Sequence, residues 1–221
     1  MKLRIFVVAG AALFAAHAAA QGFSSGLLAQ AVAATQAAKA DYAFDFEFNT
    51  SDTHWRARFE PDARPQLRLV SPSRDALEAD ERRAFDRLAE DYEGISWCAS
   101  EGMGRVSNVQ PMREDEASVT YAFQPTRESL RGEQARRFAD RLRGEVTLLK
   151  DTRDISRIRI FTTTPFDPIP FVRVERVNIV IDCHAAPNGR RYAAEATTEI
   201  RGSAFGESFD ERSVQRTRNL Q

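Results

Sequence analysis

The stretch "DYAFDFEF" (residues 41–48) has an aromatic side chain at every second position, with alanine or an acidic residue between them. Strict alternation is typical of a β-strand that has one buried face and one face in water. Four aromatics share the apolar face of this predicted strand: Tyr42, Phe44, Phe46 and Phe48. An aromatic face of this size has to be covered by another layer of the fold.

Two more alternating segments follow and extend the same pattern. In "HWRARFE" (residues 54–60) Trp55 and Phe59 alternate with arginines, and in "QLRLV" (residues 66–70) Leu67 and Leu69 flank Arg68. The polar segments "NTSD" and "PDARP" separate the three strands and are short enough for hairpin connections. The chain therefore begins its sheet as an antiparallel meander.

Three helices are predicted outside the strands. The first, in "SSGLLAQAVAATQAAKA" (residues 24–40), has an apolar stripe through Leu27, Ala31, Ala34 and Ala38. The second, in residues 71–94, has a predicted capping box from Asp75 to Glu78 and ends at Gly94, and the third, in residues 131–144, ends at Gly144. Each apolar stripe is narrow, so these helices are suited to covering a sheet and not to forming a core by themselves.

The remainder of the chain is read as strands. One is "SVTYAFQP" (residues 118–125), and five more follow from Glu145 onward, the last being "SAFGESF" (residues 203–209). In residues 170–183 the apolar phase flips near Arg176, which predicts a β-bulge there. We therefore predict an α+β fold with nine or ten antiparallel strands in one curved sheet, one face in water and the other beneath the helices.

The N-terminus has the pattern of a secretory signal. Lys2 and Arg4 precede an apolar run that ends in small residues, and cleavage is expected between Ala18 and Gln21. We exclude residues 1–20 and assign residues 21–221 to a single domain. Removing Lys2 and Arg4 leaves 29 basic against 32 acidic residues, and no basic block remains to bind nucleic acid.

The sequence contains two cysteines, Cys98 and Cys183, separated by 85 positions. In an exported protein an even pair is most simply a disulfide, and the register of residues 170–183 turns Cys183 toward the core. Two buried free thiols are the alternative. An oxidising exported space, the periplasm, is the expected location.

The order and length of these elements resemble those of the periplasmic outer-membrane lipoprotein carrier and receptor family over nearly all of residues 21–221. Locally, "ARPQLRLVSP" (residues 63–72) looks like that family's proline-then-arginine strand ahead of a lid helix. The resemblance implies an unclosed half-barrel, covered by an N-terminal helix and two mid-chain helices, around a hydrophobic hollow. It also implies that Arg68 corresponds to the arginine that holds the lid closed.

With such a lid, the apolar faces of the first three strands would line a cavity for a lipid or acyl chain. The predicted lining residues are Tyr42, Phe44, Phe46, Phe48, Trp55, Phe59, Leu67, Arg68 and Leu69. The alternative is that the same aromatics fill a dry core, in a structural or partner-binding envelope protein. In either case we expect a hydrophobic ligand or an envelope protein as the partner, and no membrane-spanning segment after the signal.

Sequence motifs for catalysis are missing. The predicted domain has only His54 and His184, neither beside a second histidine or a free cysteine, so a metal site and a Ser/His/Asp arrangement are unsupported. "GESFD" does not match the nucleophile elbow. We therefore predict a protein without enzymatic activity, cofactor or metal, whose function is binding or transfer of a lipid or lipoprotein.

Overall fold

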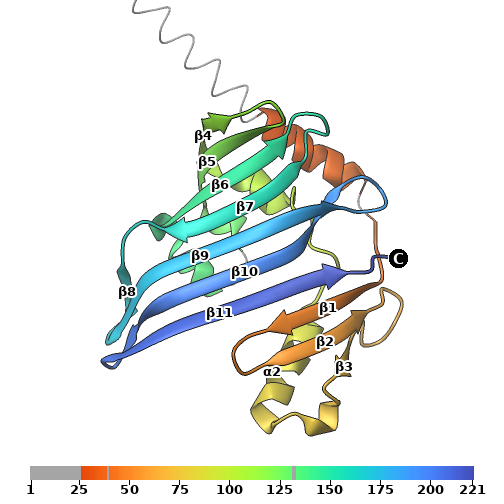
Figure 1. The fold of residues 1–221 in the computed structure, drawn as a ribbon, viewed down its shortest axis with the longest axis vertical. Helices are drawn as coiled ribbons and strands as arrows, with labels where there is room; N and C mark the ends of the chain where they lie inside the picture. Colours follow the sequence, from red (N-terminus) through yellow and green to blue (C-terminus); the bar gives the residue numbers. More distant parts are fainter. Residues whose placement is uncertain (1–25, 39, 131–132) are drawn as a thin grey trace, which may run out of the picture.

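A computed structural model describes residues 26–38, 40–130 and 133–221. The predicted signal peptide lies outside these residues. Within them, one antiparallel sheet holds eleven strands and is not closed on itself, because β3 and β4 form its two edges (Figure 1). The α+β class and the unclosed antiparallel sheet predicted from the sequence are confirmed.

The strands follow the order β3-β2-β1-β11-β10-β9-β7-β6-β5-β4, and β8 pairs with β9 outside this path. Their bounds are β1 (Phe44–Asn49), β2 (His54–Phe59), β3 (Leu67–Ser71), β4 (Ser107–Glu114), β5 (Ser118–Gln124), β6 (Leu142–Leu149), β7 (Ile155–Thr162), β8 (Phe166–Ile169), β9 (Val172–Ala185), β10 (Arg191–Ala204) and β11 (Glu207–Arg218). The last strand lies between β1 and β10 and so joins the N-terminal meander to the rest of the sheet.

The helical segments are short. They comprise residues 26–37, α2 (Ala79–Glu90), α3 (Glu133–Arg137) and four 3-10 turns, η1 (Arg74–Ala76), η2 (Glu101–Arg105), η3 (Arg127–Ser129) and η4 (Ala139–Arg141). In Figure 1, α2 lies against the β1–β3 end of the sheet, and the helix of residues 26–37 lies toward the opposite end.

One face of the sheet carries rows of opposite charge that run across the strands. Arg159 lies 3.7 Å from Glu145 and donates a hydrogen bond of 2.9 Å to Asn178. Asn178 donates to Glu199, which is 3.8 Å from Arg212, so one row crosses β6, β7, β9, β10 and β11. Each exposed pair adds little to stability, but the rows explain why this face can meet water.

The opposite face packs against the helices in separate clusters. The helix of residues 26–37 buries Leu28 and Ala31 against β5, β6, β7 and the disulfide. A second cluster, called the aromatic cluster below, lies between β1–β3 and α2. Its buried members are Phe44, Phe46, Trp55, Ala57, Phe59, Leu67, Leu77 and Phe85. The sheet therefore has two helix-covered regions, one at each end.

The predicted disulfide between Cys98 and Cys183 is confirmed, with Cα atoms 6.3 Å apart. Cys98 lies in the segment that runs from α2 toward β4 along the covered side of the sheet. In this segment the Cys98 amide donates a hydrogen bond of 3.0 Å to the Arg191 carbonyl. The neighbouring residue, Trp97, forms an isolated β-bridge with Tyr192. The disulfide thus fastens this crossing segment to the centre of the sheet.

The structure corrects one detail of each predicted helix. The first helix buries Leu28, Ala31 and Thr35, while Ala34, which the predicted stripe includes, is exposed. The capping box of α2 joins Glu78 and Glu81, three residues after the predicted position. Among the described residues of the predicted third helix, only the five of α3 are α-helical, and the 3-10 turn η4 follows them.

Gly144 does not end a helix, because it lies inside β6. The ring of Phe123, its cross-strand neighbour on β5, covers it so closely that a Cβ at Gly144 would lie 2.1 Å from a ring carbon. A glycine within a strand often marks such a close approach. The bulge predicted near Arg176 is confirmed by a register shift opposite Arg201 and Gly202.

Three strands were not predicted from the sequence. β4 and β8 were missing altogether, and "SAFGESF", expected as a last strand, contains the turn between β10 and β11, so β11 was missed as well. β4 is an edge strand that is exposed along most of its length, so it has no alternation to detect. β11 carries polar side chains on both faces, including Arg212 and Gln215, and is recognisable only from its pairing with β1 and β10.

Candidate functional site: a groove beside the aromatic cluster

The aromatic cluster is built around Tyr92, which follows α2. The Tyr92 ring centroid lies 6.1 Å from that of Phe44, 5.2 Å from Phe46 and 5.8 Å from Phe59. Phe44 and Phe59 face each other across β1 and β2 with their rings stacked at 4.9 Å. Since Phe44 and Phe46 are only 0% and 1% exposed, these rings fill the layer between the strands and the end of α2.

Trp55 forms the other end of the cluster. Its ring lies 5.5 Å from Phe48 and 5.5 Å from Phe85 of α2, with the second pair perpendicular. The indole N–H of Trp55 is buried, and no acceptor among the described residues bonds to it. A buried donor without an acceptor is costly, so this atom is a ready partner for a polar atom of a ligand or water.

Helix α2 covers the aromatic cluster with few buried side chains. Phe85 is its only fully buried residue, Ala84, Leu88 and Ala89 are partly buried against the aromatic cluster, and the rest of the helix is rich in charged side chains. Leu77, just before the helix, adds a second buried contact. Arg74 and Asp86 form a two-point ion pair at 2.6 and 3.3 Å, which ties the preceding turn to the helix. A thin cover of this kind can move at low cost.

A groove of about 490 Å³ opens between α2 and the edge strand β3. It is lined by Pro65, Leu67, Arg68, Leu69, Arg74, Phe85, Asp86, Ala89 and Glu90. The lining combines apolar side chains with charged side chains from both sides of the groove. Its volume is in the range of small-molecule sites, and it leads directly to Phe85 of the aromatic cluster.

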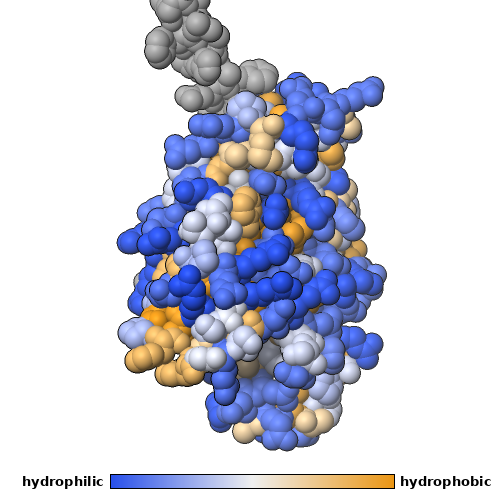
Figure 2. All heavy atoms as spheres, turned by 60° about the vertical axis from the view of Figure 1, so that its left-hand side comes forward, coloured by the Kyte–Doolittle hydropathy of each residue, from blue (hydrophilic) through white to orange (hydrophobic). Residues whose placement is uncertain are grey.

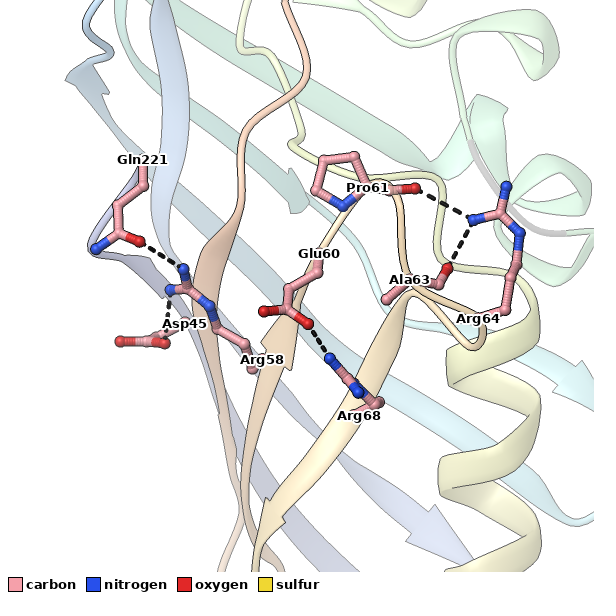
Figure 3. Close-up of polar contacts among 8 residues, drawn as sticks. All are labelled: Asp45, Arg58, Glu60, Pro61, Ala63, Arg64, Arg68 and Gln221. Atoms are coloured by element: carbon pink, nitrogen blue, oxygen red, sulfur yellow. Dashed lines mark hydrogen bonds and ion pairs between the residues drawn. The ribbon is translucent and has the colours of Figure 1, made fainter.

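Arg68 is directed at Glu60, the residue that follows β2. Figure 3 shows its guanidinium directed at Glu60, with which it forms an ion pair. On neighbouring strand β2, Arg58 bonds to Asp45 at 3.0 Å and to Gln221 at 2.8 Å. Arg74, and not Arg68, makes the ion pair with α2.

The same polar contacts act on the carboxyl group of Asp45. Hydrogen bonds from Asn219, at 2.7 Å, and from Arg58 lower the pKa of Asp45 below its ordinary value, the Asn219 bond most of all. The carboxylate is therefore held ionised and fixes the chain just after β11 to β1.

The structure brings together most of the residues predicted to line a cavity. The aromatic cluster contains Phe44, Phe46, Phe48, Trp55, Phe59, Leu67 and Leu69. Tyr42 lies elsewhere, against Trp97 at 6.2 Å, in a small cluster with Tyr192. Phe85 and Tyr92 complete the site, and neither is among the residues that the sequence analysis assigned to the cavity.

A second cavity of about 450 Å³ lies between the helix of residues 26–37 and strands β4–β6. Its lining residues are Leu27, Gln30, Pro111, Glu114, Val119, Tyr121, Leu148, Leu149, Lys150 and Arg153. Lys150 and Glu114 pair at 2.7 Å on its rim. Burial raises the pKa of Tyr121, helped by the nearby charge of Glu114. Because it lies elsewhere in the same protein, this cavity can serve as the control site for variants in the groove.

The histidines His54 and His184 lie on the exposed surface. His54 bonds to Asn49 at 3.0 Å on the exposed side of the sheet, and His184 is exposed. Among the described residues, no three His, Cys, Asp or Glu side chains are grouped so that they could hold a metal. In that same part of the chain, no helix is long and apolar enough to cross a membrane.

Comparisons of the chain with protein-family models, curated proteins and solved structures found no match.

Proposed function

We propose that this protein binds the hydrocarbon chain of a lipid or an acylated molecule between α2 and strands β1–β3, entering by the groove at β3. The protein acts in the periplasm, where it carries or transfers its ligand. The observation that supports this proposal is a helix with one buried side chain lying over a cluster of aromatics. The disulfide supports an oxidising compartment.

The free energy gained by burying Phe85 of α2 is similar in size to that gained by burying a few methylene groups of a ligand. Full burial of a side chain such as Phe85 contributes about 1.5 to 3 kcal/mol, and each buried CH₂ group of a ligand contributes about 0.8 kcal/mol. A segment of about four methylene groups therefore offsets the loss of the Phe85 contact. A longer acyl chain has the energy to displace α2 and occupy its place against Phe46, Trp55 and Phe59.

The rim of the groove suits an anionic head group. The side chains of Arg68 and Arg74 are 53% and 57% exposed, so each can exchange its carboxylate partner for a phosphate or a ligand carboxylate. The Trp55 N–H would donate to an ester or amide oxygen close to the chain. These polar groups would orient a ligand that the hydrophobic cluster holds.

A second candidate is a structural or partner-binding envelope protein without a ligand. Close ring contacts favour it, because Phe44, Phe46, Phe59 and Tyr92 already fill the layer under α2. In this case α2 stays fixed and the groove is only a surface depression.

Filling the groove separates the two candidates. The Leu69→Trp variant places a larger ring in the groove, and we expect it to weaken binding of a dansyl-labelled fatty acid about tenfold, measured by fluorescence titration. Leu149→Trp is the matched control, because Leu149 is a half-buried strand residue that lines the second cavity. The control should leave the affinity within about twofold.

Two outcomes would contradict the acyl-binding proposal. One is the absence of saturable binding by the unmutated protein, which would favour the structural candidate. The other is a loss of affinity in Leu149→Trp with none in Leu69→Trp, which would move the ligand to the second cavity.

A further inference from the structure

The longest strands of the sheet end in two adjacent turns, far from the aromatic cluster. Pro170–Phe171 joins β8 to β9, and Phe205–Gly206 joins β10 to β11. The amide of Phe205 donates to the carbonyl of Phe171 at 2.8 Å, and the two rings stack with centroids 6.0 Å apart. Together, residues 168–171 and 204–206 form a tip that projects at the lower left of Figure 1.

The tip is the most apolar exposed part of the described surface. Five large hydrophobic side chains are exposed among the described residues, and three of them are here: Ile169 at 61%, Phe171 at 79% and Phe205 at 79%. The other two, Val70 and Met112, are isolated on edge strands. Figure 2 brings this side forward and shows apolar atoms gathered at the left edge of a largely hydrophilic surface.

Both phenylalanines occupy backbone positions where folding alone favours other residues. Phe171 has φ of 66° and Phe205 has φ of 52°, followed by Gly206 at 87°. Two successive positive φ values mark a type I′ hairpin turn, for which Asn-Gly is the preferred pair. A bulky side chain in this region is uncommon and strained. Phenylalanine at both turns is therefore explained by what the rings contact, not by turn formation.

The backbone of the tip is suited to an apolar environment. Pro168 and Pro170 have no N–H groups, and the Phe205 amide is already bonded across the two turns. Ala204 pairs with Val172 within the sheet. Few peptide donors would therefore lose a partner if the tip left water, which is the main cost of placing backbone in hydrocarbon.

Charged side chains surround the base of the tip in balanced pairs. Arg173 lies 3.4 Å from Asp167, and Arg201 lies 2.9 Å from Asp210. Residues 167–176 and 201–212 contain four arginines and five acids, so the ring carries both signs and almost no net charge. This pattern complements a layer of zwitterionic head groups, where a strongly anionic surface would favour a cluster of arginines.

We propose that this tip docks the protein on a phospholipid bilayer, with Phe171, Phe205 and Ile169 inserted at the interface and the paired charges level with zwitterionic head groups. Two stacked, exposed rings at the end of a projecting tip fit a fluid interface, which does not require a preformed pocket. The proposal does not depend on ligand binding at the groove. It adds a surface that holds the protein at the membrane.

The test is cosedimentation of the purified protein with phosphatidylcholine vesicles. We expect the Phe171→Asn/Phe205→Asn variant to lose binding by at least about tenfold, because each inserted ring contributes on the order of a tenfold change. Asparagine tolerates positive φ, so the variant should keep or raise its Tm. Val70→Ser, which changes an exposed apolar residue outside the tip, should bind vesicles as the unmutated protein does.

The balanced ring of charges gives a second readout. Binding should change less than about twofold between low salt and about 0.5 M salt, because the ring of charges has almost no net charge to be screened. Failure of the unmutated protein to bind these vesicles would overturn the proposal. So would dimers that form through the tip in solution without vesicle binding, since the occupant would then be a second copy of the chain.

Discussion

Replacing Cys98 and Cys183 together by alanine should lower the free energy of unfolding by about 4 kcal/mol. The reason is the loop of 85 residues that the bond closes, for which the loss of chain entropy in the unfolded state amounts to about 4 to 5 kcal/mol. For a domain of this length the change corresponds to a fall in Tm of about 10 °C. Urea unfolding of the oxidised protein and the double variant measures it.

Reduction is the matched control for this prediction. The unmutated protein unfolded under reducing conditions should show the same loss, whereas the double variant should be insensitive to reductant. A loss below about 1 kcal/mol in both experiments would contradict the account. It would mean that the hydrogen bonds around residues 96–98 hold the crossing segment without the bond.

Replacing Asp154 by alanine should cost about 3 to 5 kcal/mol of stability. Asp154 is 0% exposed, accepts from the Ile155 amide at 2.8 Å and from the Arg191 amide at 3.1 Å, and lies 3.7 Å from the guanidinium of Arg190. It joins the turn after β6 to the hairpin between β9 and β10. Its removal leaves two peptide donors and one cation without their acceptor.

A double-variant cycle with Arg190→Ala tests the mechanism. Arg190 is more accessible than Asp154, at 20% against 0% side-chain exposure, so its loss alone should cost less. The pair should show favourable coupling, because removing Arg190 relieves part of the penalty of Asp154→Ala. Equal and additive effects would show that Asp154 acts only through the two amides.

Patterns that depend on local alternation were predictable from the sequence. β1, β2 and β3 have nearly the predicted bounds because their aromatic or aliphatic faces repeat every second residue. The disulfide followed from the even number of cysteines and the expected exported location. The bulge near Arg176 followed from a phase change that only a strand with one buried face can show.

Features that depend on tertiary contacts were not predictable. Gly144 reads as a helix stop, but its place in β6 is decided by the Phe123 ring on the next strand. At the site, the alternating aromatics of β1 and β2 were predictable from the sequence. The contact of Tyr92 with these rings, and the position of Tyr42 against Trp97 and not in the aromatic cluster, were not. The groove depends on where α2 lies relative to β3, which no local pattern specifies.

Contact between an acyl chain and the aromatic cluster can be measured through Trp55. The chain has two tryptophans, Trp55 and Trp97, so Trp97→Phe leaves the fluorescence of Trp55 alone. We predict that dibrominated stearate quenches this fluorescence in a saturable titration, because a chain bound under α2 brings bromine against the indole. Unbrominated stearate should compete. A folded Trp97→Phe protein whose Trp55 fluorescence is unchanged by the brominated chain would contradict acyl binding at this site.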